Sequence, residues 1–132
     1  MSGVAPMAPY KLRFIHAYRA GQIREGLGTA GTAGKVIVQR TQLKVADIHY
    51  REINEAFAVV NLHAEAQSGI PRERTDLYGG GISIGHPPGA TGLRMTITAM
   101  HYLADNGGRY AVAGMCLGSG MGMATLIENL QR

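Results

Sequence analysis

The residue with the clearest chemical potential is His86, which lies in the segment GGGISIGHPPGATG from Gly79 to Gly92. Histidine titrates near neutral pH and is the commonest general acid or base. The following Pro87 biases His86 away from helical geometry, and glycines on both sides leave its ring unobstructed. We therefore interpret the segment as a functional site. The alternative is a tight strand-to-helix connection that carries a surface histidine.

A second candidate is Cys116, the single cysteine of the chain, which begins the run CLGSGMG. Glycines at 118, 120 and 122 allow successive backbone N–H groups to point at an anion, which would stabilise a thiolate or an oxyanion. The alternative is a small buried hydrophobic side chain. One cysteine permits no disulfide within the chain and fits a reducing compartment.

The third candidate is Asn54, at the end of an expected strand. The alternation DIHYREI predicts a strand in which Ile48, Tyr50 and Ile53 pack, and residues 56–66 predict an apolar helix. Asn54 would stand between the two elements, where capping of the helix is the alternative role. Because ligands of open α/β sheets bind beyond the carboxyl ends of strands, we expect Asn54, His86 and Cys116 to converge.

The remaining elements are expected to frame this site. A helix is expected over 9–20, and a glycine-rich loop or insertion over 21–40, because Gly28 to Lys35 lacks the pattern of a phosphate loop. Ile82 to Ile84 reads as a short strand-like alternation. A helix over 93–106 is expected to bury Leu93, Ile97, Met100 and Leu103, and the helix over 56–66 to bury Phe57, Val60 and Ala64. Strands over 110–115 and 123–130 would form a hairpin around the glycine turn.

Composition limits the class of protein. The 132 residues fit one domain, 1–132, with 45% hydrophobic and 17% charged residues, typical of a globular chain. No apolar run approaches the length of a membrane span, and the first residues lack the order of a secretory signal. The net charge of +4 is dispersed, so it favours an anionic ligand weakly and a nucleic acid hardly at all.

Two other catalytic classes are disfavoured. Cys116 and His86 are too few ligands for zinc beside scattered histidines, so no metal is expected. A serine hydrolase would need a G-x-S-x-G elbow, whereas Ser119 stands in C-L-G-S-G.

Three blocks together resemble the C-terminal half of the thiolase family. They are NEAFA at Asn54–Ala58, GGGISIGHPPGATGLR at Gly79–Arg94, and CLGSGMG at Cys116–Gly122. The resemblance covers roughly residues 41–132 well and 1–9 loosely. It implies an α/β layered fold with a mixed sheet and helices, incomplete here because only the C-terminal half is represented. It also implies that the strand that opens this half, central in the sheet of the family, is missing before Met1.

The resemblance implies an acyltransferase of acyl-CoA metabolism that makes or cleaves 3-ketoacyl-CoA. His86 would activate the nucleophile and, with the Gly118 amide, contribute to the oxyanion holes. Asn54 would hold a water, and Cys116 would shuttle the α proton. The nucleophilic cysteine of the family belongs to an N-terminal half, so the isolated chain is expected to be inactive.

Further expectations concern ligands and partners. Gly85 and Phe57 would contact the substrate, a coenzyme A thioester, and no separate cofactor is expected. The chain would self-associate or bind a complementary N-terminal half, in the cytoplasm or an organelle matrix. The alternative function is a non-catalytic acyl-CoA-binding or assembly module. Two departures from the family stand out, Gly81 in place of a small aliphatic residue and Ser119 in place of glycine.

Overall fold

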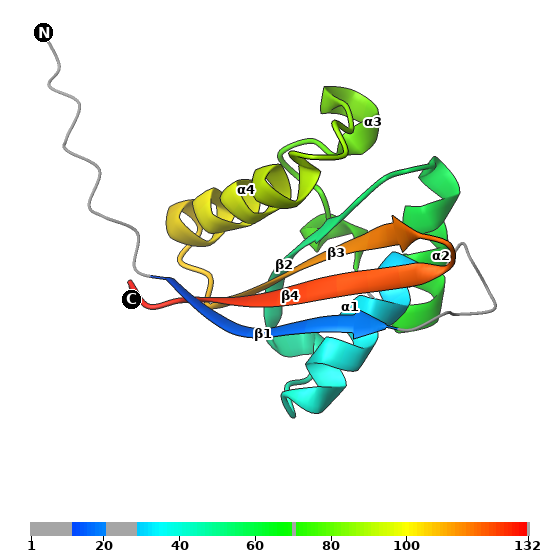
Figure 1. Cartoon of the computed structure of the whole chain (residues 1–132). Coiled ribbons are helices and arrows are strands. Elements are labelled where there is room, and N and C mark those ends of the chain that lie inside the picture. Colours follow the sequence, from blue (N-terminus) through cyan, green and yellow to red (C-terminus); the bar gives the residue numbers. More distant parts are fainter. Residues whose placement is uncertain (1–11, 21–28, 70, 132) are drawn as a thin grey trace, which may run out of the picture.

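A computed structural model describes residues 12–20, 29–69 and 71–131 as a mixed sheet with helices on both faces (Figure 1). The sheet order is β1-β4-β3-β2; β4 is antiparallel to both neighbours, and β2 is parallel to β3. The strands are β1 (Leu12–Ala20), β2 (Ile48–Ile53), β3 (Tyr110–Gly118) and β4 (Met121–Asn129). The longer helices are α1 (Thr29–Arg40), α2 (Ala58–Ser68) and α4 (Thr91–Asp105), with short helices η2 (Val45–Asp47), η3 (Arg72–Arg74) and α3 (Gly81–Ile84). The expected α/β class is confirmed.

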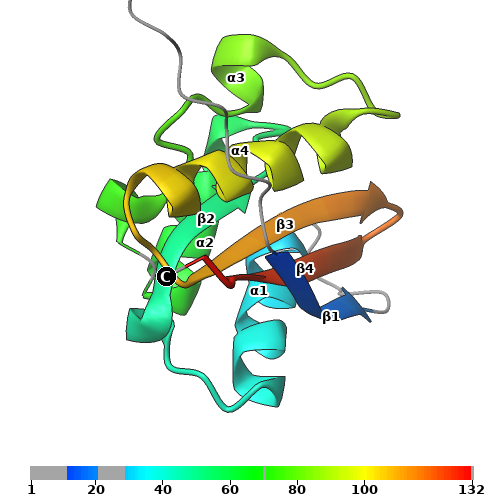
Figure 2. The same cartoon turned by 90° about the vertical axis from the view of Figure 1, so that its left-hand side faces the viewer.

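The sheet separates two apolar layers (Figure 2). Helix α1 covers one face, where the cluster comprises Ile37, Val38, Ile48, Val112, Ala124 and Leu126. Helix α4 covers the other face, where the cluster comprises Tyr50, Ala99, Leu103, Ala111 and Ile127. Helix α2 packs Val60 and Ala64 against Ile53 at the end of β2. Because strand side chains alternate, β3 and β4 supply residues to both layers.

The strand expected over 47–53 is confirmed as β2, with one irregularity. Ile48, Tyr50 and Ile53 are all buried, but the register with β3 shifts between Ile48 and Tyr50. A shift of one residue reverses the faces of the side chains that follow. Ile48 therefore packs with α1, whereas Tyr50 packs with α4. After the shift, Tyr50, Glu52 and Asn54 follow the α4 face.

The helix expected over 9–20 is wrong. Residues 12–20 form β1, which pairs with β4 from Leu12 opposite Asn129 to Ala20 opposite Gly122. Pairing of eight of its nine residues satisfies the backbone in a way that local periodicity does not reveal. The expectation of a missing opening strand is wrong as well, because β1 supplies it, at the edge of the described sheet.

The loop expected over 21–40 is wrong for its second part. Thr29–Arg40 is helix α1, while residues 21–28 lie outside the described residues. Glycine disfavours helix, but Ile37 is fully buried and packing outweighs that cost. A Cβ at the buried Gly34 would lie 3.6 Å from Val112, an ordinary van der Waals distance, so the contact with the sheet leaves room for a methyl group there.

Three further local expectations need correction. Ile82–Ile84 belongs to helix α3, not to a strand. Helix α4 is confirmed near its expected bounds, but it buries Thr91, Met95, Ala99 and Leu103; of the expected stripe Leu93 is 66% exposed and Ile97 42%. Helix α2 begins at Ala58, and Phe57, expected in its buried stripe, is 69% exposed. The hairpin of β3 and β4 is confirmed.

Candidate active site

His86 is exposed and held at one ring nitrogen by the first residue of α4. Its Nδ1 lies 2.6 Å from Oγ1 of Thr91, a side chain that is 1% exposed. The Thr91 hydroxyl donates to the carbonyl of Pro87 at 2.9 Å. A hydroxyl has one proton, so while it donates to Pro87 the Thr91 hydroxyl can only accept from an Nδ1–H of His86. In that tautomer Nε2 is the acceptor of the ring.

Asn54 lies against Nε2 of His86. Its Nδ2 is 3.4 Å from His86 Nε2, and its backbone N–H donates to the Gly114 carbonyl at 2.9 Å. The residue is 1% exposed, yet its Oδ1 has no hydrogen-bond partner within the described part of the chain. Buried polar atoms normally have partners, so this inaccessible oxygen stands out as an unsatisfied acceptor within the site.

The capping role considered for Asn54 is wrong. The N-cap position of α2 is Phe57, without a side-chain hydrogen bond, and Asn54 lies three residues earlier. Glu55 also precedes the helix, and its carboxylate accepts from the backbone N–H of Ile82.

Cys116 lies near the end of β3, half-buried and with a free thiol. Gly114, two residues before Cys116, accepts the hydrogen bond from the Asn54 backbone. The carboxyl ends of the parallel strands β2 and β3 therefore meet at one edge of the sheet, as expected. Among the described residues, no hydrogen bond joins the Cys116 thiol to Asn54 or His86. Asn54 therefore contacts His86 directly, whereas Cys116 is linked to Asn54 only through the pairing of the end of β2 with Gly114 of β3.

The turn after Cys116 uses left-handed backbone geometry. Gly118, Ser119 and Gly120 have φ angles of 82°, 51° and 70°. Glycine adopts this region without strain, whereas a side chain costs about 1–2 kcal/mol there. Ser119, the departure noted in the sequence, therefore occupies a position with glycine-like geometry. Anion binding by this turn stays a prediction.

The two residues expected to contact the substrate are both accessible. Gly85 has φ of 91°, directly before His86, and a Cβ there would meet no atom within 4 Å. The Phe57 ring is exposed beside the end of β2. Their role in binding stays a prediction.

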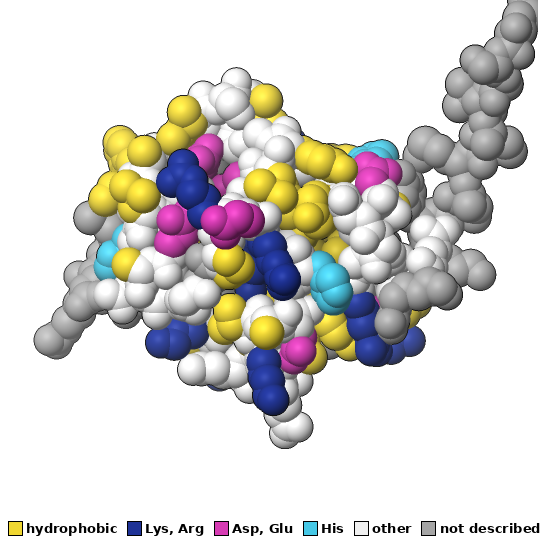
Figure 3. All heavy atoms as spheres, turned by 180° about the vertical axis from the view of Figure 1, so that it is seen from behind, with side chains coloured by type: hydrophobic (Ala, Val, Ile, Leu, Met, Phe, Trp, Pro, Cys, Tyr) yellow, Lys and Arg dark blue, Asp and Glu magenta, His cyan; other side chains and the backbone are white. Residues whose placement is uncertain are grey.

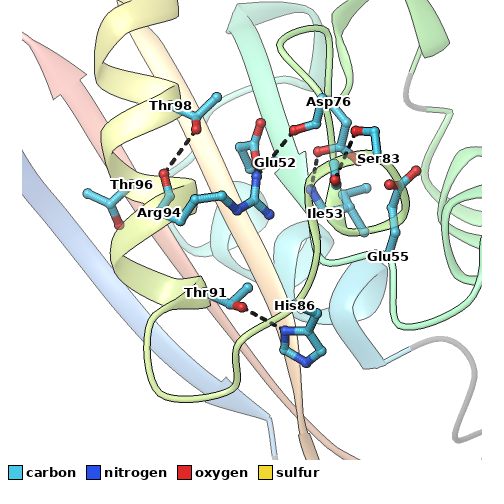
Figure 4. A network of polar contacts seen from close by, with 12 residues as sticks. Glu52, Ile53, Glu55, Asp76, Ser83, His86, Thr91, Arg94, Thr96 and Thr98 are labelled. Carbon is cyan, nitrogen blue, oxygen red and sulfur yellow. Dashed lines mark hydrogen bonds and ion pairs between the residues drawn. The ribbon is translucent and has the colours of Figure 1, made fainter.

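A buried ion pair beneath the site was not expected from the sequence. Arg94 reaches toward Glu52 from α4 (Figure 4), and its Nη1 donates to Glu52 Oε2 at 2.7 Å. The same nitrogen donates to the Gly79 carbonyl at 3.3 Å, and the Tyr50 hydroxyl donates to the other oxygen of Glu52. Glu52 is fully buried, and burial raises its pKa to about 7 although Arg94 opposes the shift. Burial also raises the pKa of Tyr50. The sequence signal for this pair is weak, because Glu52 follows Arg51 in a strand, IHYREI, that also carries a histidine.

Asp76 was also missed, because it lies in what reads as a polar surface connection. Its Oδ1 accepts from the Ile53 N–H at 3.0 Å (Figure 4), and its Oδ2 accepts from Asn61 Nδ2 at 2.6 Å. Burial raises the pKa of Asp76 to about 6. Asp76 thus joins the loop that precedes Gly79 to Ile53, the residue before Asn54.

The described ranges contain neither a cluster of metal-binding side chains nor a membrane-spanning helix. No cluster of three or more His, Cys, Asp or Glu side chains in residues 12–20, 29–69 and 71–131 could hold a metal ion. Within the same residues, no helix has the length and apolar character needed to cross a membrane.

The geometry defines an α/β domain with an asparagine–histidine pair at the strand ends, and comparison with known proteins identifies its family. Residues 10–129 match the family described as "Thiolase, C-terminal domain". The chain therefore belongs to the thiolase family. This match includes residues 21–40, which the resemblance seen in the sequence did not cover.

Relatives and solved structures agree. The chain is 36% identical over 129 residues to a beta-ketothiolase of Cupriavidus necator, covering 97% of this chain and 32% of that protein. It is 43% identical over 104 residues to peroxisomal 3-ketoacyl-CoA thiolase B of Rattus norvegicus, covering 78% and 24%. Human mitochondrial 3-ketoacyl-CoA thiolase, solved with CoA, superposes with a TM-score of 0.82 at 32% identity, covering 89% of this chain and 30% of that one. The chain thus spans about a third or less of these relatives.

Proposed function

We propose that this chain supplies the C-terminal catalytic residues of a thiolase that makes or cleaves 3-ketoacyl-CoA. The observation that carries the proposal is the ordered contact from Thr91 through His86 to Asn54, with the Nε2 lone pair of His86 facing the site. The similarity to 3-ketoacyl-CoA thiolases, one of them solved with CoA, supports the substrate class.

The condensation needs two thiols with different tasks. An acyl group first moves from CoA to a nucleophilic thiol, which releases CoA. Cys116 then removes the α proton of acetyl-CoA, and the enolate carbon attacks the acyl carbon. The new carbon–carbon bond forms as the carbon–sulfur bond breaks, and the proton passes from Cys116 to the departing thiolate. Because the chain contains one cysteine, the nucleophilic thiol must come from elsewhere.

The other residues would stabilise charge. His86 Nε2 would take the proton of the nucleophilic thiol, and the imidazolium would then donate to the thioester oxygen. The unpaired Oδ1 of Asn54 supports its role in holding a water beside His86. The backbone N–H of Gly118 would donate to a second oxyanion, a contribution of about 2.7–4 kcal/mol in such sites. Gly85 and Phe57 would contact the substrate, and no separate cofactor is required.

The surface supports a partner that supplies the missing thiol. Hydrophobic side chains gather over α2 and α3 (Figure 3), and further ones lie on α4 and β3. Those exposed by more than half are Phe57, Leu62, Ile82, Ile84 and Leu93. Extended apolar surface of this kind marks an interface. We propose that a complementary thiolase N-terminal half or a further copy of this chain covers it. A cytoplasmic or organelle-matrix location is part of the same proposal.

Complementation tests this function. The chain is mixed with the part of the C. necator relative that it does not match, and thiolysis of acetoacetyl-CoA is measured. We expect activity only in the mixture. His86→Ala should lower kcat/KM by at least about 100-fold while association persists, because the exposed ring serves chemistry rather than the sheet. His49→Ala, an exposed histidine on β2 away from this edge, is the control.

Two results would overturn the proposal. The first is a mixture that forms a complex and binds CoA without turnover, which would favour the non-catalytic module. The second is loss of association in His86→Ala, which would assign the histidine to structure.

A further inference from the structure

The loop that carries His86 is fixed to the end of β2 by a carboxylate that the mechanism above does not use. Glu55 follows Asn54 directly, and its Oε2 accepts the backbone N–H of Ile82 at 3.0 Å. Ile82 lies in α3, the short helix that leads into Gly85 and His86. Figure 4 shows Glu55 beside Ser83 and Ile53, above the imidazole. One side chain thus joins the two segments that carry the asparagine and the histidine.

The Glu55 carboxylate is itself oriented by an amide. Asn61 Nδ2 lies 3.3 Å from Glu55 Oε1 and 2.6 Å from Asp76 Oδ2. An NH₂ group has two protons, so Asn61 can donate one to each carboxylate. Asp76 in turn accepts from the N–H of Ile53, on the other side of Asn54. The residues before and after Asn54 are therefore anchored by one connected network.

The sequence leaves room for this carboxylate at Gly80. A Cβ built there would lie 2.2 Å from Glu55 Oε2 and 2.6 Å from its Cδ. The backbone of Gly80, with φ of −99° and ψ of −168°, suits any residue. The absence of a side chain at this position is therefore explained by the Glu55 carboxylate and not by backbone strain.

We propose that Glu55 is a positioning residue: its carboxylate fixes α3, and through α3 the His86 ring, against Asn54. The catalytic value of this contact rests on the proposed function, but the placement itself does not. Thr91 holds the Nδ1 side of the ring from α4, so Glu55 controls the other side, where Nε2 meets Asn54.

The placement is tested by NMR of the full chain. The readouts are the nuclear Overhauser effect between the Asn54 side-chain amide and the His86 ring, and the ¹⁵N shifts of both ring nitrogens. Glu55→Ala should abolish the Overhauser effect and shift Nε2, while Nδ1 keeps the signal of its bond to Thr91. Gly80→Ala should do the same, because it displaces only the carboxylate. Glu65→Ala, which lines the same cavity of about 650 Å³, should change neither.

The double variant gives the sharpest comparison. With Glu55 already replaced by alanine, Gly80→Ala should add no further shift, because its only severe clash is gone. An unchanged Overhauser effect in Glu55→Ala, or additive effects in the double variant, would overturn the proposal. Should Glu55→Ala fail to fold, Gly80→Ala decides alone, because it retains every polar group.

A kinetic readout separates this inference from the proposed function. In the complemented enzyme, Glu55→Ala should lower kcat about 10-fold with KM little changed, since displaced groups impair the chemical step. Wild-type kcat with a displaced ring would overturn the positioning role. Absence of turnover in the wild-type mixture would overturn the proposed function and leave the NMR result intact.

Discussion

The two faces of the sheet have different chemical character. The face under α1 is closed by aliphatic side chains such as Ile37 and Leu126, both fully buried. The face under α4 also buries tyrosine, alanine and leucine, but it continues into Glu52 and Arg94 and ends at Asn54 and His86. Apolar packing is non-directional, whereas hydrogen bonds and ion pairs fix orientation. The face under α1 therefore stabilises the fold, and the face under α4 also fixes the orientation of the site residues.

The largest effect should come from breaking the ion pair of the polar face. Arg94→Met leaves the Glu52 carboxylate buried without its cation, which costs about 3–5 kcal/mol at pH 8. At pH 5 Glu52 is protonated in the folded state, since its pKa is about 7, so the loss should shrink markedly. Urea unfolding followed by circular dichroism at both pH values measures this.

Leu126→Ala is the matched change on the apolar face. It should cost about 3 kcal/mol, because it leaves a cavity in the core, and the loss should be equal at both pH values. A pH-independent loss in Arg94→Met would remove the distinction between the two faces.

The second prediction concerns the wild-type chain. Folding raises the pKa of Glu52 to about 7 and of Asp76 to about 6, above the values of about 4 in the unfolded chain. Between these values the folded state binds more protons, so stability falls as pH rises from about 4 to about 7. Each unit by which folding raises a pKa corresponds to about 1.4 kcal/mol, so we expect the free energy of unfolding to decrease by several kcal/mol over this range.

Glu52→Gln provides the control for that decrease. Its unfolding free energy should vary less over the same pH range, because one of the two titrating carboxyls is gone. Stability that rises with pH in the wild type would contradict the assignment of these carboxyls.

The smallest effect is expected at the turn, where both faces end. Ser119→Gly should stabilise the chain by about 1 kcal/mol, because the φ angle of 51° favours glycine. Gly118→Ala should destabilise it by a similar amount: a Cβ would meet no atom within 4 Å there, but φ is 82°. Thermal unfolding measures both. Equal melting temperatures for Ser119→Gly and wild type would show that the serine is accommodated without strain.

The sequence alone determined the class of fold and the family, and it predicted the position of the candidate site. Strand β2, helix α4 and the β3–β4 hairpin follow from short-range periodicity and glycine stops, which act through neighbouring residues. His86 and Asn54 were identified from their motifs, and the structure brings them to 3.4 Å. These features could be predicted because the residues that determine them lie within a few positions of one another in the sequence.

Tertiary structure decided the remainder. Residues 12–20 became a strand because β4 pairs with them, and Thr29–Arg40 became a helix because Ile37 and Val38 pack on the sheet. The register shift between Ile48 and Tyr50 set which face Glu52 and Asn54 occupy. The hydrogen bonds of Glu52 with Arg94 and of Glu55 with Ile82 join residues 42 and 27 positions apart. Such contacts depend on where the folded chain places its segments, and no local pattern encodes them.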